Sequence, residues 1–388
     1  MIGKHLLLTL RSLRRNLLYA ILVITGLALG ITTFLSTIQW SAWHLTFDRD
    51  FPREELIYRL TFEENREGFY RHTARILHGN ALNKIIFTDM LPGIELSGRL
   101  APFRKGAFII GDRTFYEEHT YACDPTFLEI FQPGVISGER EGMLDAPFTM
   151  ILTRSAATRF FGDEDPVGQS LELMHQFDSY PTTYSVTAVI EDFPPNSHFR
   201  ISVLTSFEDP VKYTWTAWTY LKLQGGADPR QTEEDIRQFI TSNIDEPYAQ
   251  RLQPRLQPVT DIHLKSHKAR EIQPNVRFRT VLILITAGML VFLLAWFNFT
   301  LLSFSQNQLN IQQLVIQWQM GAGKRNFLFQ FILDNLLVGV IAFAGGILLT
   351  FLLSPSIQQL GGIPVARDPG ILAFSILLLS CSSAPAQY

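Results

Sequence analysis

Cysteine is scarce in this chain of 388 residues, which contains only Cys123 and Cys381. Cys123 lies in a polar region and Cys381 in an apolar run near the end of the sequence. Two such distant thiols do not form the pattern of a disulfide-stabilised domain, so we expect both to be unpaired structural cysteines.

Motifs for nucleotide, metal and acyl-transfer chemistry are also missing. In QWQMGAGKRN, residues 317–326, Trp318 stands where a phosphate-binding loop needs its first glycine, and Arg325 where it needs Ser or Thr. His263 and His267 have the i, i+4 spacing of a metal-binding helix but lack the intervening glutamate of a metalloprotease. No G-x-S-x-G elbow occurs. We therefore expect no catalytic centre, metal, cofactor or nucleic-acid partner.

Charged residues are absent from long parts of both ends of the chain. Residues 41–278 hold 25 Lys and Arg against 34 Asp and Glu, whereas from Arg279 onward only four basic and two acidic residues occur. The first 40 residues carry no acidic side chain and four basic ones, Lys4, Arg11, Arg14 and Arg15. The sequence is thus an acidic, polar middle between two apolar ends.

Three apolar runs are long enough to cross a hydrocarbon core of ~30 Å as helices. They cover residues 17–39, 279–303 and 327–353. The first is longer than the core of a signal peptide, so it indicates a retained anchor. A fourth run, residues 370–384, is shorter than the roughly 20 residues that a span needs. It is either a marginal span or the mark of a truncated or split gene product.

Basic residues predict the orientation of these spans. The basic N-terminus, residues 1–16, and the loop 304–326, whose only charges are Lys324 and Arg325, are expected in the cytoplasm. The segments expected on the opposite side of the membrane are residues 40–278 and 354–369.

Local patterns in the polar middle favour a mixed α+β domain. Residues 107–122 alternate around Gly111-Asp112, which predicts a hairpin. Thr153 and Gly162 bracket a short helix, Thr153 as its N-cap and Gly162 just past its end. Residues 183–193 alternate as a half-buried strand. The predicted fold class is an integral membrane α-helical protein with three to four transmembrane helices and a large extracytoplasmic α+β domain between the first two.

A few residues inside the spans are candidates for helix packing or proton transfer. Gly26 and Gly30 form a G-x-x-x-G motif, which permits close helix packing in the first span. Asp334 lies in the third span and is expected to face protein or water rather than lipid. Asn298 in the second span is a candidate hydrogen-bond partner for it. Helix packing and a proton relay both remain possible roles for this pair.

Several stretches together resemble the ABC-transporter permease family typified by MacB and FtsX. They are RSLRRNLLYAILVITGLALGI, FDRDFPREELIYRL, FYEEHTYACDPTFLEIF, ILTRSAATRFFGDEDPVGQSLEL, VTAVIEDFPPNSHF, LQPVTDIHL, NFTLLS and MGAGKRNFLFQFILDNLL, in this order. The resemblance implies a MacB-like periplasmic core domain in a multi-pass protein of the bacterial inner membrane. It also implies a non-catalytic subunit that transmits the motion of a cytoplasmic ABC ATPase, for export or envelope-related work. Expected partners are that ATPase, a second copy or second permease half, and a periplasmic adaptor or cell-wall hydrolase.

The resemblance further implies that the cytoplasmic loop docks on the ATPase. The family pattern Glu-x-Gly-Ile-Arg-Lys-x-Leu-Gly-Ala-Ser aligns with Gln313 at the glutamate, Val315 at the glycine, Gln317 at the arginine and Trp318 at the lysine. Most of the charge is therefore replaced, which weakens electrostatic steering more than packing. The predicted coupling residues are Gln313, Ile316, Gln317, Trp318, Met320, Gly321, Ala322, Lys324 and Arg325. The alternative is a regulator or scaffold that is truncated or has lost ATP coupling.

Overall fold

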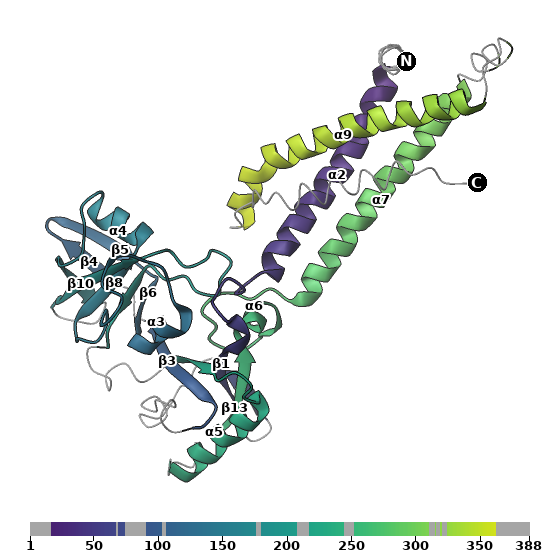
Figure 1. The fold of residues 1–388 in the computed structure, drawn as a ribbon. Helices are drawn as coiled ribbons and strands as arrows, with labels where there is room; N and C mark the ends of the chain where they lie inside the picture. The colour runs from purple at the N-terminus through teal and green to yellow at the C-terminus, as the bar shows by residue number, and fades with distance from the viewer. Residues whose placement is uncertain are drawn as a thin grey trace. The chain divides into compact units, whose positions relative to one another are not determined.

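The computed structural model describes residues 17–66, 69–73, 91–102, 106–175, 180–207, 217–243, 252–309, 315, 319 and 324–361. The chain divides into two compact units (Figure 1). One combines residues 1–45 with 278–388, and its described part is helical; the other comprises residues 46–277 and contains the sheet. The predicted combination of apolar helices with a large α+β unit is confirmed.

The helical unit contains three helices that are long and apolar enough to cross a membrane. They are α2 (Leu17–Leu45), α7 (Phe278–Leu309) and α9 (Lys324–Gly361). Each is longer than the span expected from hydropathy, and α9 continues through Pro355 into the range 354–369. The fourth expected run, residues 370–384, lies outside the described residues.

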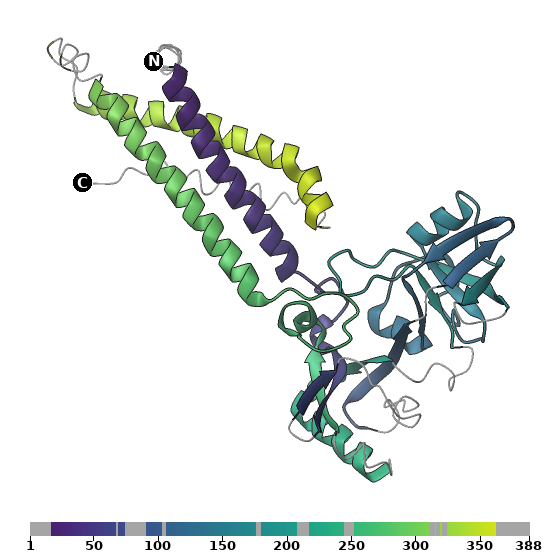
Figure 2. The same cartoon turned by 180° about the vertical axis from the view of Figure 1, so that it is seen from behind.

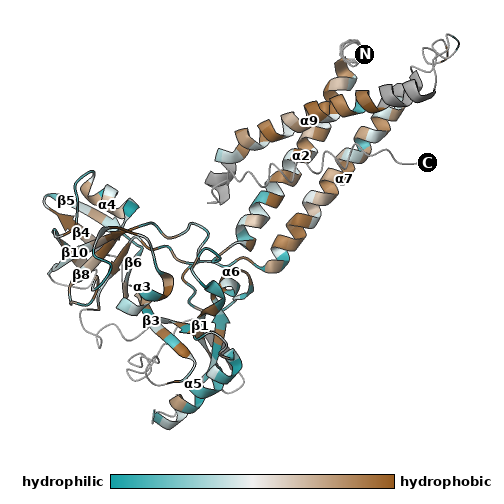
Figure 3. Ribbon diagram, in the orientation of Figure 1, coloured by the Kyte–Doolittle hydropathy of each residue, from teal (hydrophilic) through white to brown (hydrophobic). Residues whose placement is uncertain are grey.

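Helix α2 is the packing centre of this unit. It runs beside α7 and is crossed by α9, as the two opposite views show (Figures 1 and 2). Their shared apolar core consists of Val23, Leu27, Ile31, Leu35, Phe299, Val338 and Ala342. Many large apolar side chains are also exposed along the described parts of α7 and α9, where brown prevails in Figure 3, as expected for helices surrounded by lipid.

The second unit is built on a sheet with thirteen strands in the described part of the chain, in the order β13-β1-β12-β3-β6-β11-β8-β10-β9-β4-β5, with β2 on β1 and β7 on β10. The strands are β1 (Ile57–Arg66), β2 (Phe69–Thr73), β3 (Ile94–Pro102), β4 (Gly106–Ile110), β5 (Arg113–Glu117), β6 (Thr120–Cys123), β7 (Val135–Gly138), β8 (Thr149–Thr153), β9 (Ser170–His175), β10 (Thr182–Ile190), β11 (Val203–Thr205), β12 (Trp218–Leu223) and β13 (Leu252–Pro258).

Short helices cover this sheet and divide its interior into three apolar clusters. Helix α3 (Pro125–Phe131) packs into the central cluster and α4 (Arg154–Phe161) into the cluster under β8, β9 and β10. Helix α5 (Pro229–Asn243) buries Ile236 and Ile240 against β1, β12 and β13. Two 3-10 turns, η1 (Glu54–Leu56) and η5 (Val259–Asp261), and the one-turn α6 (Ile262–Lys265) complete it.

The local predictions for this unit are confirmed. Gly111 and Asp112 form the turn between β4 and β5, and Gly111 has φ of 58°. The Thr153 hydroxyl accepts a hydrogen bond from the N–H of Ala156 at 3.4 Å, and Gly162 follows α4 with φ of 69°. The alternating stretch forms β10. Each of these features depends on neighbouring residues alone.

Candidate functional site

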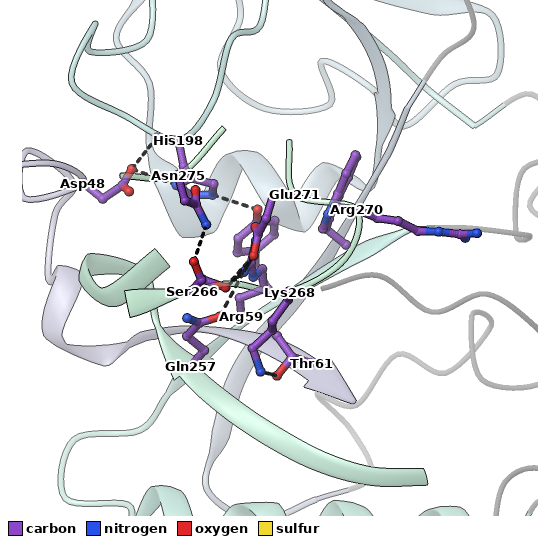
Figure 4. A network of polar contacts seen from close by, with 12 residues as sticks. Asp48, Arg59, Thr61, His198, Gln257, Ser266, Lys268, Arg270, Glu271 and Asn275 are labelled. Atoms are coloured by element: carbon purple, nitrogen blue, oxygen red, sulfur yellow. Dashed lines mark hydrogen bonds and ion pairs between the residues drawn. The ribbon is translucent and has the colours of Figure 1, made fainter. Parts of the chain in front are cut away.

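The globular unit is connected to the membrane helices at two places in the sequence. Its first residues, 46–48, directly follow α2, and its last, residues 259–277, directly precede α7. Both segments are fastened inside the unit by polar side chains that are buried or half-buried (Figure 4). We call these side chains the connector network; it comprises Asp48, Arg59, Thr61, Asn196, His198, Trp218, Tyr220, Gln257, Ser266, Lys268, Glu271 and Asn275.

The first connecting segment is held by Asp48, which is only 1% exposed. Its Oδ1 accepts hydrogen bonds from the backbone N–H of His198 at 2.8 Å and from His198 Nδ1 at 2.7 Å. The Asp48 N–H donates to the carbonyl of Asn196 at 2.9 Å, and the Asn196 amide donates to the carbonyl of Thr46 at 3.1 Å. The left-handed backbone of Asp48, with φ of 60°, brings these groups together.

His198 continues this chain of contacts into the sheet. Its Nε2 lies 2.8 Å from the hydroxyl of Tyr220, a fully buried residue of β12. A carboxylate oxygen accepts, so Nδ1 donates to Asp48, and the Tyr220 hydroxyl is the hydrogen-bond partner of Nε2. Burial raises the pKa of Tyr220 well above its usual value, which keeps the phenol protonated as a donor.

The second connecting segment is held by Arg59, a fully buried side chain of β1. Its Nη1 and Nη2 donate to the two carboxylate oxygens of Glu271 at 2.6 and 3.0 Å. Nη2 also donates to Gln257 Oε1 at 2.9 Å and lies 3.3 Å from Ser266 Oγ. This two-pronged contact fixes the orientation of Glu271 as well as its distance from the strand.

Three further bonds fix the same segment along its length. Lys268 Nζ donates to Thr61 Oγ1 at 2.8 Å, and the Trp218 indole donates to the carbonyl of Arg270 at 3.0 Å. The Asn275 amide donates to the carbonyl of Ser266 at 3.0 Å. Burial, together with the nearby Arg59 guanidinium, lowers the pKa of Lys268.

The two connecting segments also touch each other. Phe47, next to α2 in the sequence, stacks on the buried ring of His263 with centroids 3.6 Å apart and ring planes 12° from parallel. Arg59 and Tyr220, one from each half of the network, are directly opposite in the register of β1 and β12. The start and the end of the globular unit are therefore joined through a single set of contacts.

The connector network is arranged to hold rather than to react. Arg59 is fully buried, and His198 bridges Asp48 and Tyr220 in the interior. Breaking a buried pair of this kind costs about 3–5 kcal/mol, because the remaining charge stays in a poorly solvated place. The network can thus keep the two connecting segments in one fixed geometry.

The residues predicted for helix packing lie at or beside the α2–α7 contact where they are described. A Cβ placed on Gly30 would lie 2.3 Å from Ala295 Cβ, so α7 occupies the space that this glycine leaves. A Cβ on Gly26 would lie 3.9 Å from Asn298 Nδ2. The side chain of Asp334 lies outside the described part of the structure, so its pairing with Asn298 stays a prediction.

The predicted coupling residues fall mostly outside the described residues. Lys324 and Arg325 begin α9, but the structure describes only their backbone. The coupling role of the loop remains a prediction. The predicted coupling residues that lie wholly outside the described part of the structure are Gln313, Ile316, Gln317, Trp318, Met320, Gly321 and Ala322.

The histidine and cysteine candidates of the sequence differ in burial where they are described. Helix α6 ends at Lys265, so His263 is buried in it while His267 is exposed beyond its end. Within the described ranges no three His, Cys, Asp or Glu residues are grouped as metal ligands require. Cys123 is a buried free thiol, and Cys381 lies outside the described residues.

Sequence reasoning missed the connector network as a site. A signal was present: FDRDFPREELIYRL, VTAVIEDFPPNSHF and LQPVTDIHL each supply a member, namely Asp48, His198 and Gln257. These stretches lie far apart in the sequence, so only the fold shows that their polar side chains converge.

Several solved structures are similar to part of this chain. Similar solved structures include a domain of a putative permease protein from Porphyromonas gingivalis, with 22% identity and a TM-score of 0.47 over 54% of this chain and 92% of that one. The periplasmic region of MacB from Actinobacillus actinomycetemcomitans matches with 14% identity and a TM-score of 0.38 over 55% and 92%. The extracellular domain of the noncanonic ABC-type transporter YknZ from Gram-positive bacteria matches with 11% identity and a TM-score of 0.38. This match covers 52% of this chain and 99% of that one.

No curated protein matches the chain. The family model described as the MacB-like periplasmic core domain matches residues 20–239, which is more than half of the 388 residues. The chain therefore belongs to the MacB-like family of ABC-transporter permeases.

Proposed function

We propose that this chain is the membrane subunit of an ABC transporter and carries ATP-driven motion from its membrane helices to its periplasmic domain. The observation that supports this most directly is the connector network. It fastens both segments that continue into α2 and α7, so a displacement of either helix is passed to the sheet instead of being absorbed by a loose linker.

The close α2–α7 contact at Gly30 supports the same role. Two helices packed backbone to backbone move together more readily than two helices separated by long side chains. Inside the globular unit, the stacked pair Phe47 and His263 joins the segment that follows α2 to the segment that precedes α7.

ATP hydrolysis is assigned to a separate cytoplasmic chain. In this proposal residues 1–16 and 304–326 face the cytoplasm and residues 40–278 the periplasm, as the basic residues of the two short segments favour. The complex contains two permease halves, either two copies of this chain or one copy and a second half, in the inner membrane. Its work is export or an envelope-related task.

Co-purification tests this proposal and the coupling residues together. A joint replacement of Met320 and Gly321 by Asp, with Lys324 and Arg325 changed to Ala, should reduce the ABC ATPase recovered with the full chain about tenfold. Arg230→Ala with Arg237→Ala, on the exposed side of α5, is the matched control and should recover the normal amount. Equal recovery of the ATPase with the unchanged chain, the loop variant and the α5 variant would show that this loop does not dock the ATPase.

The glutamines of the loop favour a second candidate function, a periplasmic regulator or scaffold without ATP coupling. Gln313, Gln317 and Trp318 replace the charged residues of the family pattern. In this case the unchanged chain would purify without any ABC ATPase, under conditions in which a MacB-like relative keeps its own. ATPase bound to the unchanged chain would instead exclude the scaffold.

A further inference from the structure

Helix α2 is approached closely by both of its neighbours at one level, residues 28–32. Helix α7 fills the space that Gly30 leaves, and α9 crosses α2 at Ala28 and Ile31 (Figures 1 and 2). A Cβ on Gly346 of α9 would lie 2.8 Å from Ile31 Cγ2 and 3.1 Å from the carbonyl oxygen of Ala28. The backbone of α9 therefore touches α2 at a point where a side chain does not fit unless its neighbours move.

A polar contact lies at the same point. Thr32 is 5% exposed, and its Oγ1 lies 2.8 Å from the carbonyl oxygen of Ala28 and 3.1 Å from that of Gly346. The single proton of this hydroxyl is thus shared between α2 and α9. Thr350 Oγ1, one turn further along α9, donates to the same Gly346 carbonyl at 2.8 Å. A hydrogen bond between membrane helices holds them in one alignment.

The residues of α9 one turn from Gly346 all carry a side chain. On the same face of the helix these residues are Ala342, Phe343, Leu349 and Thr350. A shift of α9 by one turn in either direction would bring one of these side chains to the point where a Cβ already meets Ile31 at 2.8 Å. The glycine therefore permits one register of α9 on α2 and excludes its neighbours.

The apolar part of the helical core does not specify a register in this way. The buried residues that α9 adds to it are Val338 and Ala342. Burial of apolar surface is non-directional, so such contacts tolerate a shift along the helix axis. A single alignment of the two helices therefore comes from the contact between Thr32 and Gly346.

We propose that Thr32 and Gly346 form a register lock, a contact that holds α9 at one position along α2 while the subunit works. The inference rests on the proposed function, because α9 begins in the predicted coupling loop and α2 continues into the connecting segment that contains Asp48. Movement that enters at the loop then passes from α9 to α2 without slippage. Thr32 is a positioning residue in this path.

Disulfide formation in membranes that contain the full chain measures the register. A Cβ on Gly345 would lie 3.7 Å from Ala28 Cβ, within the roughly 3.5–4.5 Å that a disulfide needs. Ala28→Cys is combined in turn with Gly345→Cys, Ile341→Cys or Leu349→Cys, the last two one turn away on either side. We expect the Gly345→Cys pair to crosslink about tenfold faster than the other two, both with and without added MgATP.

The thiols that stay reduced are counted from gel shifts, after denaturation and reaction with a polyethylene-glycol maleimide. Cys381→Ser is present in every variant, and the buried Cys123 is left unchanged. Equal rates for the three pairs would overturn the proposal. A transfer of crosslinking to Ile341→Cys or Leu349→Cys when MgATP is added would overturn it as well.

Gly346→Ala adds the excluded Cβ to the lock. Overpacking of this kind should reduce the preference for the Gly345→Cys pair about tenfold. Gly339→Ala is the matched control on the same helix, because a Cβ there would have no atom within 4 Å, and it should keep the full preference.

Thr32→Val keeps the branched shape of the side chain but removes the shared proton. The preference should fall about threefold, the usual effect of one hydrogen bond between membrane helices, and Thr32→Ser should retain it. Thr33→Val is the control, because Thr33 Oγ1 donates within α2, to the carbonyl of Leu29 at 2.9 Å. The amount of ATPase recovered with Thr32→Val should not change, since the loop is intact.

A preference that neither Gly346→Ala nor Thr32→Val alters would also overturn the lock. If Gly346→Ala fails to fold, Thr32→Val alone decides. A chain that recovers no ATPase still reports its register, so failure of this inference and failure of the permease function give different results.

Discussion

Replacing Arg59 by methionine is the most direct test of the connector network. The change keeps a long, flexible side chain at this position. It removes the hydrogen bonds that the Arg59 guanidinium donates to Glu271, Gln257 and Ser266. The Arg59 side chain is fully buried and that of Glu271 is 12% exposed, so the remaining carboxylate is poorly solvated. We expect a loss of about 3–5 kcal/mol, the usual cost of breaking a buried pair.

Hydrogen exchange of the full chain in detergent, followed by mass spectrometry, measures this loss where it should occur. At 1.4 kcal/mol for each factor of ten, protection of residues 259–277 should fall by about two to three and a half orders of magnitude. The matched control is Arg154→Met. Its ion pair with Glu191 has side chains 60% and 58% exposed, so it should cost only about 0–1 kcal/mol.

A second variant decides whether the buried charge is the cause. Arg59→Met combined with Glu271→Met removes both partners and leaves no buried carboxylate. Apolar replacement of a whole buried pair is often neutral or stabilising, so protection should return to within about tenfold of the unchanged chain. A double variant as poorly protected as the single one, or a single variant no worse than Arg154→Met, would refute this reasoning.

Two other changes test the helical unit and the pH dependence. Gly30→Ala should lower the melting temperature of the full chain in detergent, because the new Cβ would lie 2.3 Å from Ala295 Cβ. Ala295→Gly should restore it, whereas Gly339→Ala, with no atom within 4 Å, should have little effect. Burial, and then Glu117, raise the pKa of Tyr121 to about 12, above the ~10 of an unfolded tyrosine. This contribution is therefore complete below pH ~10 and is lost as the pH rises to about 12. Tyr121→Phe should flatten that part of a plot of urea-unfolding free energy against pH; an unchanged slope would contradict the assignment.

The parts of this fold that follow from the sequence are those in which neighbouring residues decide. An apolar run of twenty or more residues has few alternatives to a membrane helix, and Gly111-Asp112 defines its hairpin locally. The order of the strands in the sheet, in contrast, does not follow from neighbouring residues. Strand β13 pairs with β1 across almost two hundred residues, and nothing in either strand alone specifies that partner.

Arg59 shows why the candidate site was harder to predict. In IYRLTF the side chains of Tyr58, Leu60 and Phe62 alternate with those of Ile57, Arg59 and Thr61. Alternation alone would place the set that contains Arg59 and Thr61 toward solvent. In the fold, residues 259–277 supply two of the partners of Arg59, Glu271 and Ser266, so its burial depends on a segment that the strand pattern does not contain.

The choice of polar groups for this network still needs a reason, because an apolar cluster would be equally stable. Apolar contacts tolerate sliding, whereas the two-pronged contact between Arg59 and Glu271 and the bonds of Asp48 to His198 allow one alignment only. A connection that transmits motion needs that single alignment more than it needs stability. In the variant Arg59→Met with Glu271→Met, stability and alignment should separate: the fold stays intact, while the ATP-dependent movement proposed for the globular unit becomes weaker. If movement instead survives with stability, the polar groups serve folding alone.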